Sequence, residues 1–241
     1  MTALHLADET EAADLAAFLS RLLHYDRSAA VRLQAAGTAL AVFGRPASFE
    51  VLAVRAVRLA EPYRNDPDTT LDVTVSAGEL LESVDESAAT AVVPAAVTGP
   101  PWAGVLPPRG GWRSEPGLPP VGALGATVAA AVTEFRTRTG ELAQEHRTRA
   151  ELDRIGREIW SRLVGGTQLP VRAVHAAQSL RFLRPPATAG EDDTARPPAA
   201  SAEEDLALLS SGTWLRLRTP YGSIAVRRAE AGLGGLGVSV R

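Results

Sequence analysis

Lysine and cysteine are both absent from this 241-residue sequence, and Asn65 is its only asparagine. Without lysine there is no amine for Schiff-base or pyridoxal phosphate chemistry, and a P-loop or a protein kinase would lack its phosphate-binding lysine. Without cysteine there are no disulfides, no thiolate nucleophile and no cysteine zinc site. Because lysine and asparagine have AT-rich codons, the same absences indicate a genome under strong GC pressure.

Aromatic residues are scarce, at 5% of the chain, and long apolar runs are missing. The core must therefore consist mainly of Ala, Leu and Val, which is consistent with a globular protein at 45% hydrophobic and 22% charged residues. Runs such as Val128–Val132 are far shorter than the about 20 residues that span a bilayer. The acidic N-terminus has no signal-peptide pattern. We expect no membrane segment and a cytoplasmic location.

All 25 basic residues are arginines, and they are unevenly distributed. Residues 1–135 hold nine arginines against sixteen acidic residues, a net charge of −7. Residues 136–241 hold sixteen arginines against twelve acidic residues, a net charge of +4. The second half is therefore where an anionic partner is expected, unless these charges are only dispersed over solvated helix faces.

The first half has the pattern of an antiparallel sheet with two helices. Asp8-Glu9-Thr10-Glu11 and Ser76-Ala77-Gly78-Glu79 both have capping-box spacing and predict helix starts. Alternating apolar residues predict the strands. The expected elements are a strand at 3–7, a helix to about Tyr25, strands at 30–34, 38–43, 49–59 and 71–75, and a helix at 79–84. This order over residues 1–85 resembles the repeating unit of the sliding-clamp (processivity-factor) fold, which implies a clamp-like half.

Residues 99–120, GPPWAGVLPPRGGWRSEPGLPP, are dominated by proline and glycine and contain Trp102 and Trp112. Neither a helix nor a central strand suits this composition. A flexible linker rarely contains two tryptophans, so we predict an ordered strap whose indoles pack back on the protein. The alternative is a polyproline ligand that presents the tryptophans to a partner. The strap divides the chain into predicted domains at residues 1–98 and 121–241.

The second half is predicted to be helical and to end in a β-hairpin. Apolar spacing predicts a helix from Thr127 to Gly140, a long helix Glu141–Val164 that could pair with a second copy, and a helix Val171–Leu183. A third capping box at Ser201 predicts a helix Glu203–Leu209. The hairpin pairs residues 214–219 with 223–228.

Helices followed by a strand–turn–strand are typical of a winged helix, a DNA-binding arrangement. Guanidinium groups suit phosphate contacts, and Trp214 shares a strand face with two arginines. The candidate contact residues are Arg172, Arg181, Arg184, Trp214, Arg216, Arg218, Arg227 and Arg228. The alternative is an ordinary α+β domain with solvated arginines.

No catalytic, metal or cofactor motif is recognisable. The four histidines have no metal-pair spacing, and Ser76 lacks the first glycine of a nucleophile elbow. Gly232-Leu233-Gly234-Gly235-Leu236-Gly237 matches a dinucleotide fingerprint but has only four residues after it, too few for the helix that would hold the pyrophosphate. We therefore expect no catalytic residue, no metal and no cofactor.

Four stretches, AAVRLQAAGTALAVFG, LDVTVSAGELLESV, WAGVLPPRGGW and TPYGSIAVRR, resemble uncharacterised proteins of high-GC actinobacteria such as Streptomyces, known only as domains of unknown function. The resemblance implies a bacterial source and transfers no site residue. From the sequence we predict an α+β, non-catalytic interaction or scaffold protein with a protein partner or self-association. A nucleic-acid-binding protein that uses the C-terminal arginines is the first alternative, and a hydrolase without a local motif is the second.

Overall fold

The structure is a computed structural model that describes residues 3–63, 71–183 and 206–228. It is an α+β protein, as predicted, built on one antiparallel sheet with the strand order β5-β2-β3-β4-β10-β9-β8-β7. The strands are β2 (Ala30–Ala36), β3 (Ala39–Gly44), β4 (Leu52–Arg58), β5 (Asp72–Ser76), β7 (Arg113–Glu115), β8 (Ala207–Ser211), β9 (Trp214–Thr219) and β10 (Gly222–Arg227). Because β4 pairs with β10, both halves of the chain share this sheet.

The first half confirms the predicted helix starts. Asp8 caps α1 (Glu9–Tyr25) by accepting a hydrogen bond from the amide of Glu11 at 2.9 Å. Ser76 caps α2 (Ala77–Glu82) in the same way. The element order expected for residues 1–85 is observed, with a 3₁₀ turn η1 (Ala47–Phe49) added before β4. The first strand, β1 (Ala3–His5), pairs with β6 (Thr90–Val92) in a separate two-stranded ladder.

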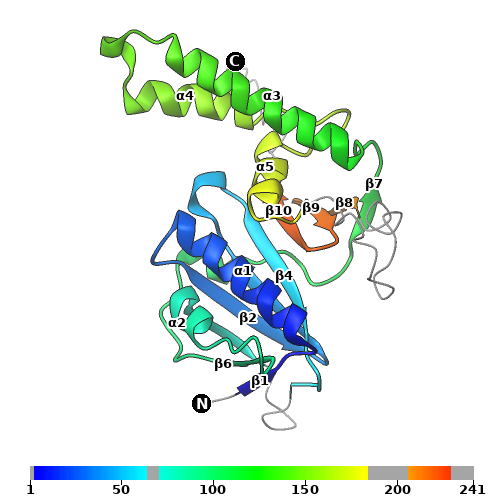
Figure 1. The fold of residues 1–241 in the computed structure, drawn as a ribbon. Helices are drawn as coiled ribbons and strands as arrows, with labels where there is room; N and C mark the ends of the chain where they lie inside the picture. The colour runs from blue at the N-terminus through cyan, green and yellow to red at the C-terminus, as the bar shows by residue number, and fades with distance from the viewer. Residues whose placement is uncertain (1–2, 64–70, 184–205, 229–241) are drawn as a thin grey trace, which may run out of the picture.

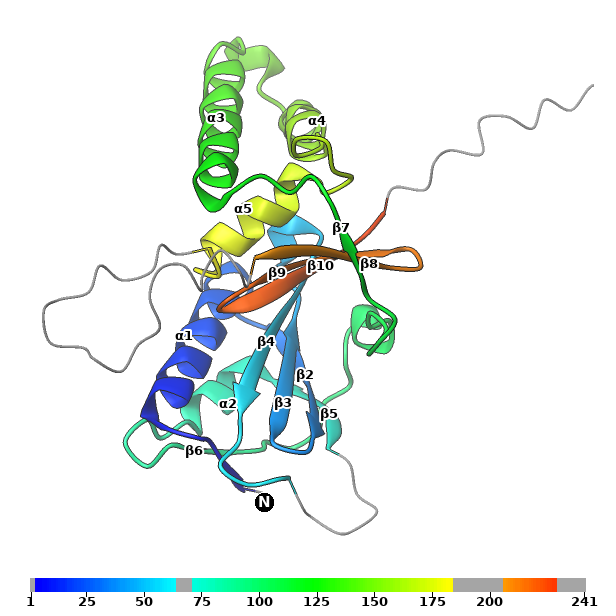
Figure 2. The same cartoon turned by 90° about the vertical axis from the view of Figure 1, so that its right-hand side faces the viewer.

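The main core lies between one face of the sheet and the helices α1 and α5 (Val171–Ser179). α1 contributes the buried Phe18, whose ring stacks on Phe182 after α5 with 5.7 Å between centroids. α1 lies along β2–β4, whereas α5 lies over the end of β10 (Figure 1, Figure 2). The core thus spans both halves of the chain.

A pair of helices projects from the sheet at the end opposite β1 and β6 (Figure 1, Figure 2). We call this pair, α3 (Val121–Gly140) and α4 (Arg149–Trp160), the helical arm. The predicted long helix Glu141–Val164 is wrong: a 3₁₀ turn, η3 (Gln144–His146), precedes α4, and Thr148 caps α4 by accepting from the amide of Glu151. The arm folds back on itself here, so residues 141–164 do not form the single long helix that was expected to pair with a second copy.

The predicted helix Glu203–Leu209 is also wrong where the structure describes it. Residues 207–211 form β8, which pairs with β9 on one side and β7 on the other. Residues 203–205 lie outside the described residues. A strand between β9 and β7 forms backbone hydrogen bonds with both neighbours. These hydrogen bonds outweigh the local preference of residues 203–209 for a helix.

The C-terminal hairpin is confirmed as β9 and β10, but it is not a free wing. β10 also pairs with β4, and β9 also pairs with β8, so both strands lie inside the sheet. In a winged helix the hairpin would extend beside the helices with an open edge. The second half therefore differs from a winged helix, and the arginines of the hairpin lie on a sheet face. The glycine-rich stretch at residues 232–237 lies outside the described residues.

Candidate binding site

The strand alternation predicted for the hairpin places its polar residues on one face. Leu215 and Leu217 are buried in the main core, whereas Trp214, Arg216 and Arg218 point to the opposite face. The register pairs Trp214 with Arg227, which extends this second face onto β10. We call this the arginine–tryptophan face.

Residues 99–112 cross the arginine–tryptophan face. η2 (Pro101–Gly104) brings the half-buried Trp102 onto a small second core, where Leu106 and Trp214 also pack. That core consists of Phe43, Leu52, Val54 and Ala225. The indole nitrogen of Trp112 donates to the carbonyl oxygen of Pro108 at 3.0 Å. Trp102 therefore packs on the sheet, whereas this hydrogen bond of Trp112 lies within the strap itself.

A pocket of about 390 Å³ opens where β4 begins and β10 ends. Its walls include three arginines, two tryptophans and one carboxylate: Arg45, Arg172, Arg227, Trp102, Trp214 and Glu50. The pairing between β4 and β10 ends at Leu52 and Ala225, so the two strands separate at this point. Arg45 and Glu50 come from the connection between β3 and β4, whereas Arg172 is the second residue of α5.

The three arginines of this pocket form no ion pair with any described residue. The guanidinium of Arg227 lies over the Trp214 ring at 4.8 Å from its centroid and donates a long hydrogen bond, of 3.5 Å, to the hydroxyl of Thr213. The Nε of Arg172 is buried and has no hydrogen-bond partner within the described ranges. Glu50 is exposed at the pocket edge. The pocket therefore has an excess of uncompensated positive charge, which favours an anionic ligand.

A second arginine–tryptophan pair lies further along β9. The Arg216 guanidinium lies 5.7 Å from the ring centroid of Trp112, and its Nε donates to the hydroxyl of Ser223 at 2.9 Å. Burial lowers the pKa of Arg216, and the neighbouring charge of Arg218 lowers it further. Arg216 nevertheless stays protonated, as arginines in proteins do. The face therefore holds two positive charges, those of Arg216 and Arg218, close together.

A wider hollow of about 680 Å³ adjoins the pocket and shares Arg45 and Trp102 with it. It is lined on its other side by small and polar residues, among them Ser28, Thr98 and the carboxylate of Asp26. The pocket and this hollow together form a groove on both sides of Trp102.

The remaining predicted contact residues lie elsewhere. Arg228 points to the other face of the sheet, where it pairs with Glu115 at 2.6 Å. Arg181 is exposed after the end of α5, with a positive φ of 62°. Arg184 lies outside the described residues. The sequence analysis missed Arg45 and Glu50, because no local motif marks them and only the sheet topology brings them to α5.

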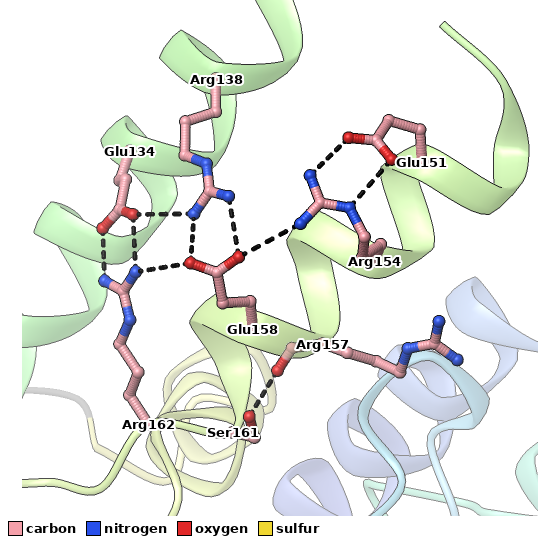
Figure 3. A network of polar contacts seen from close by, with 8 residues as sticks. All are labelled: Glu134, Arg138, Glu151, Arg154, Arg157, Glu158, Ser161 and Arg162. Atoms are coloured by element: carbon pink, nitrogen blue, oxygen red, sulfur yellow. Dashed lines mark hydrogen bonds and ion pairs between the residues drawn. The ribbon is translucent and has the colours of Figure 1, made fainter. Parts of the chain in front are cut away.

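The helical arm uses its arginines differently (Figure 3). Arg138 donates to both oxygens of Glu158, at 2.8 and 2.9 Å, and Arg162 donates to Glu134 at 2.7 Å. The hydrogen bonds from Arg138, together with the nearby charges of Arg138, Arg154 and Arg162, lower the pKa of Glu158 to about 2. The arm's network is thus internally neutralised.

His175 on α5 lies at the junction of arm and sheet, inside a run of aromatic rings. It stacks on Trp160 at 4.6 Å between centroids and meets the edge of Phe49 at 5.0 Å. Burial lowers its pKa. Within the described ranges, no group of three or more His, Asp or Glu side chains could hold a metal ion. Nor is any helix there long and apolar enough to cross a membrane.

The fold is α+β, and one face of its sheet is cationic and aromatic. The chain belongs to the family described as domain of unknown function DUF8185, whose model matches residues 107–231, and residues 1–104 match domain of unknown function DUF8010. No curated protein and no solved structure matches the chain. The resemblance to a sliding clamp therefore stays one of element order. That the chain resembles families known only as domains of unknown function is confirmed.

Proposed function

We propose that the chain is a non-catalytic binding protein that holds an anionic partner on its arginine–tryptophan face. The observation that carries this is the convergence of Arg45, Arg172 and Arg227 on one pocket without an ion pair to any described residue. Positive charges that converge without counter-charges repel one another, and a bound anion would offset this repulsion. At Arg172, whose Nε is buried, the anion would also compensate the cost of burial.

The charge of the whole chain makes the test informative. The net charge is −3, so a polyanion is repelled by the protein as a whole and attracted only where arginines converge. Binding of a polyanion would therefore indicate a local site.

The test is fluorescence anisotropy of labelled heparin with the full chain at low ionic strength. The triple variant Arg45→Gln, Arg172→Gln, Arg227→Gln should bind about tenfold or more weakly, because each arginine releases counterions on binding. The matched control is Arg136→Gln, Arg147→Gln, Arg157→Gln, which removes three exposed arginines of the arm region that likewise form no ion pair with a described residue. Equal losses in both triples would show that only net charge matters and would refute the site.

Several predictions from the sequence belong with this proposal. The division at 1–98, 99–120 and 121–241 stays a proposal. The two family matches meet between residues 104 and 107, which lies inside the proposed strap. The continuous sheet through β4 and β10 means that such domains would fold against each other. A cytoplasmic setting, an actinobacterial source, and a protein partner or self-association stay predictions.

A further inference from the structure

We propose that the anionic partner is single-stranded nucleic acid, with bases stacked on Trp102 and Trp214 and phosphates held by Arg45, Arg172 and Arg227. This rests on the proposed function, since it names the class of anion that the same pocket takes.

The aromatic residues point beyond simple anion binding. Three of the four tryptophans, Trp102, Trp112 and Trp214, lie on the arginine–tryptophan face, and all three are only half-buried. Two of them already hold a guanidinium against the ring, Arg227 on Trp214 and Arg216 on Trp112. Indole rings and guanidinium planes are the surfaces on which proteins stack unpaired bases.

The charges are placed beside those rings. Arg172 is the second residue of α5, so its guanidinium reaches the pocket from the first turn of this helix. Among the described residues, Glu50 is the single carboxylate in the wall, so the balance of charge from these residues remains positive.

The site also continues in two directions, as a polymer requires. On one side of Trp102 lies the hollow of about 680 Å³ that shares Arg45. On the other side the pair of Arg216 and Trp112 follows Trp214 along β9. Alternate residues on one strand face are about 6.5 Å apart, so the basic and aromatic groups form a path along the strand.

The shape favours a single strand over a duplex or an acidic peptide. At about 390 Å³ the pocket lies near the lower end of the range for small-ligand sites, about 300–1,000 Å³. A duplex keeps its bases stacked inside, away from an indole in a recess. An acidic peptide would satisfy the arginines but offers no flat ring for Trp102 and Trp214.

The experiment measures binding of the full chain to four probes: a single-stranded DNA oligonucleotide, its abasic counterpart of equal length and charge, the matching duplex, and poly-glutamate. We expect the base-bearing strand to bind about tenfold or more tightly than the abasic strand, since stacking contributes at each base. Its binding should quench tryptophan fluorescence. The triple variant Arg45→Gln, Arg172→Gln, Arg227→Gln should reduce the slope of log affinity against log salt by about 2.

Each alternative result decides between the two proposals. Equal binding of base-bearing and abasic strands would overturn the nucleic-acid proposal and leave anion binding intact. Tighter binding of the duplex, or binding of poly-glutamate equal to that of the oligonucleotide, would also overturn it and indicate duplex DNA or an acidic protein partner. Failure of all four probes and of heparin would refute both proposals.

Variants of the tryptophans test the stacking directly. Trp214→Leu keeps an apolar side chain on the second core but removes the flat ring, so the preference for base-bearing over abasic DNA should fall severalfold. Unchanged binding to heparin shows that this variant is folded and its arginines are in place. If the preference for bases persists in both Trp214→Leu and Trp102→Leu, the stacking model is wrong.

Discussion

The arginines of the helical arm and those of the arginine–tryptophan face have the same chemistry and opposite surroundings. In the arm, Arg138 and Arg162 are each held by glutamates of the neighbouring helix, Glu158 and Glu134 (Figure 3). At the pocket, three arginines converge without an ion pair to any described residue. Arginine count alone therefore says little about binding. What matters is whether the protein itself supplies the counter-charge.

The difference has a structural origin. Two antiparallel helices bring residues 20 to 28 positions apart into contact, and glutamates four residues from arginines complete the network. The pocket is instead assembled from three distant segments, the connection between β3 and β4, the start of α5 and the end of β10. The arm's network stabilises local structure, whereas the pocket leaves its charges available.

The largest expected effect comes from Arg55, which is paired and also buried. Its guanidinium contacts Asp14 at 3.0 Å and Glu11 at 3.3 Å on α1, and donates to the carbonyl oxygen of Tyr221 at 2.8 Å. Arg55→Met leaves two half-buried carboxylates without this cation. It should lower the free energy of unfolding by about 3 kcal/mol, measured by urea denaturation.

The matched control for that variant is Arg45→Met. Arg45 is exposed and forms no ion pair with a described residue, so its replacement should change stability by less than about 0.5 kcal/mol while weakening heparin binding. A similar loss of stability in both variants would contradict the distinction between arginines that stabilise the fold and arginines that are available to bind a ligand.

The next effect tests whether pairing is what keeps the arm from binding anions. Glu134→Gln with Glu158→Gln leaves Arg138 and Arg162 without counter-charges, so this variant should gain salt-dependent retention on heparin. The dependence of the variant's stability on pH should also differ from that of the wild type. The pKa of Glu158 is lowered to about 2, so its contribution to stability is present above its ordinary value and lost as the pH falls towards 2.

Thermal melting between pH 5 and pH 2 measures this second consequence. The wild-type protein should lose stability steeply over that window, and the double variant should start lower and lose less. Identical pH profiles would show that the network contributes nothing to folding. Absence of any gain on heparin would show that unpairing alone does not create a binding surface.

Local signals in the sequence predicted local structure well. The capping boxes at Asp8 and Ser76 marked true helix starts, because a cap depends only on a few neighbouring residues. Thr148-Arg149-Ala150-Glu151 has the same spacing and marks the start of α4, so the true boundary was available in the sequence. The capping box at Ser201 predicted a helix that would include residues 207–209, which instead form a strand. This strand forms because residues 207–211 pair with β7 and β9.

The site was predicted only in fragments. Trp102 was assigned to a strap, and Arg172, Trp214 and Arg227 to a DNA-binding module, whereas the structure brings all four to one pocket. That convergence depends on β4 pairing with β10 across the two halves of the chain. No sequence pattern near Arg45 predicts this long-range pairing. The place of Arg45 and Glu50 in the pocket could therefore not be predicted without the structure.

A smaller effect is expected at the junction between arm and sheet, where aromatic stacking rather than ion pairing makes the contact. Burial between Trp160 and Phe49 lowers the pKa of His175. The unfolded chain therefore binds a proton more readily than the folded protein, and stability falls as the pH drops below about 6.5. In His175→Phe, which keeps the stack, the melting temperature should depend less on pH between 7 and 5. A dependence as steep as in the wild type would show that His175 is not responsible.

The smallest expected effect concerns Glu50, the one carboxylate in the wall of the pocket. Glu50→Gln removes a negative charge that repels an anionic ligand, so affinity for heparin and for single-stranded DNA should rise about two- to threefold at low salt and converge with the wild type at high salt. Glu82→Gln, on the exposed surface of α2, changes net charge equally and should have no such effect. Equal gains in both variants would mean that the anion responds to the charge of the whole protein. A gain confined to Glu50→Gln would locate the anion within a Debye length of this pocket, because charges further away are screened.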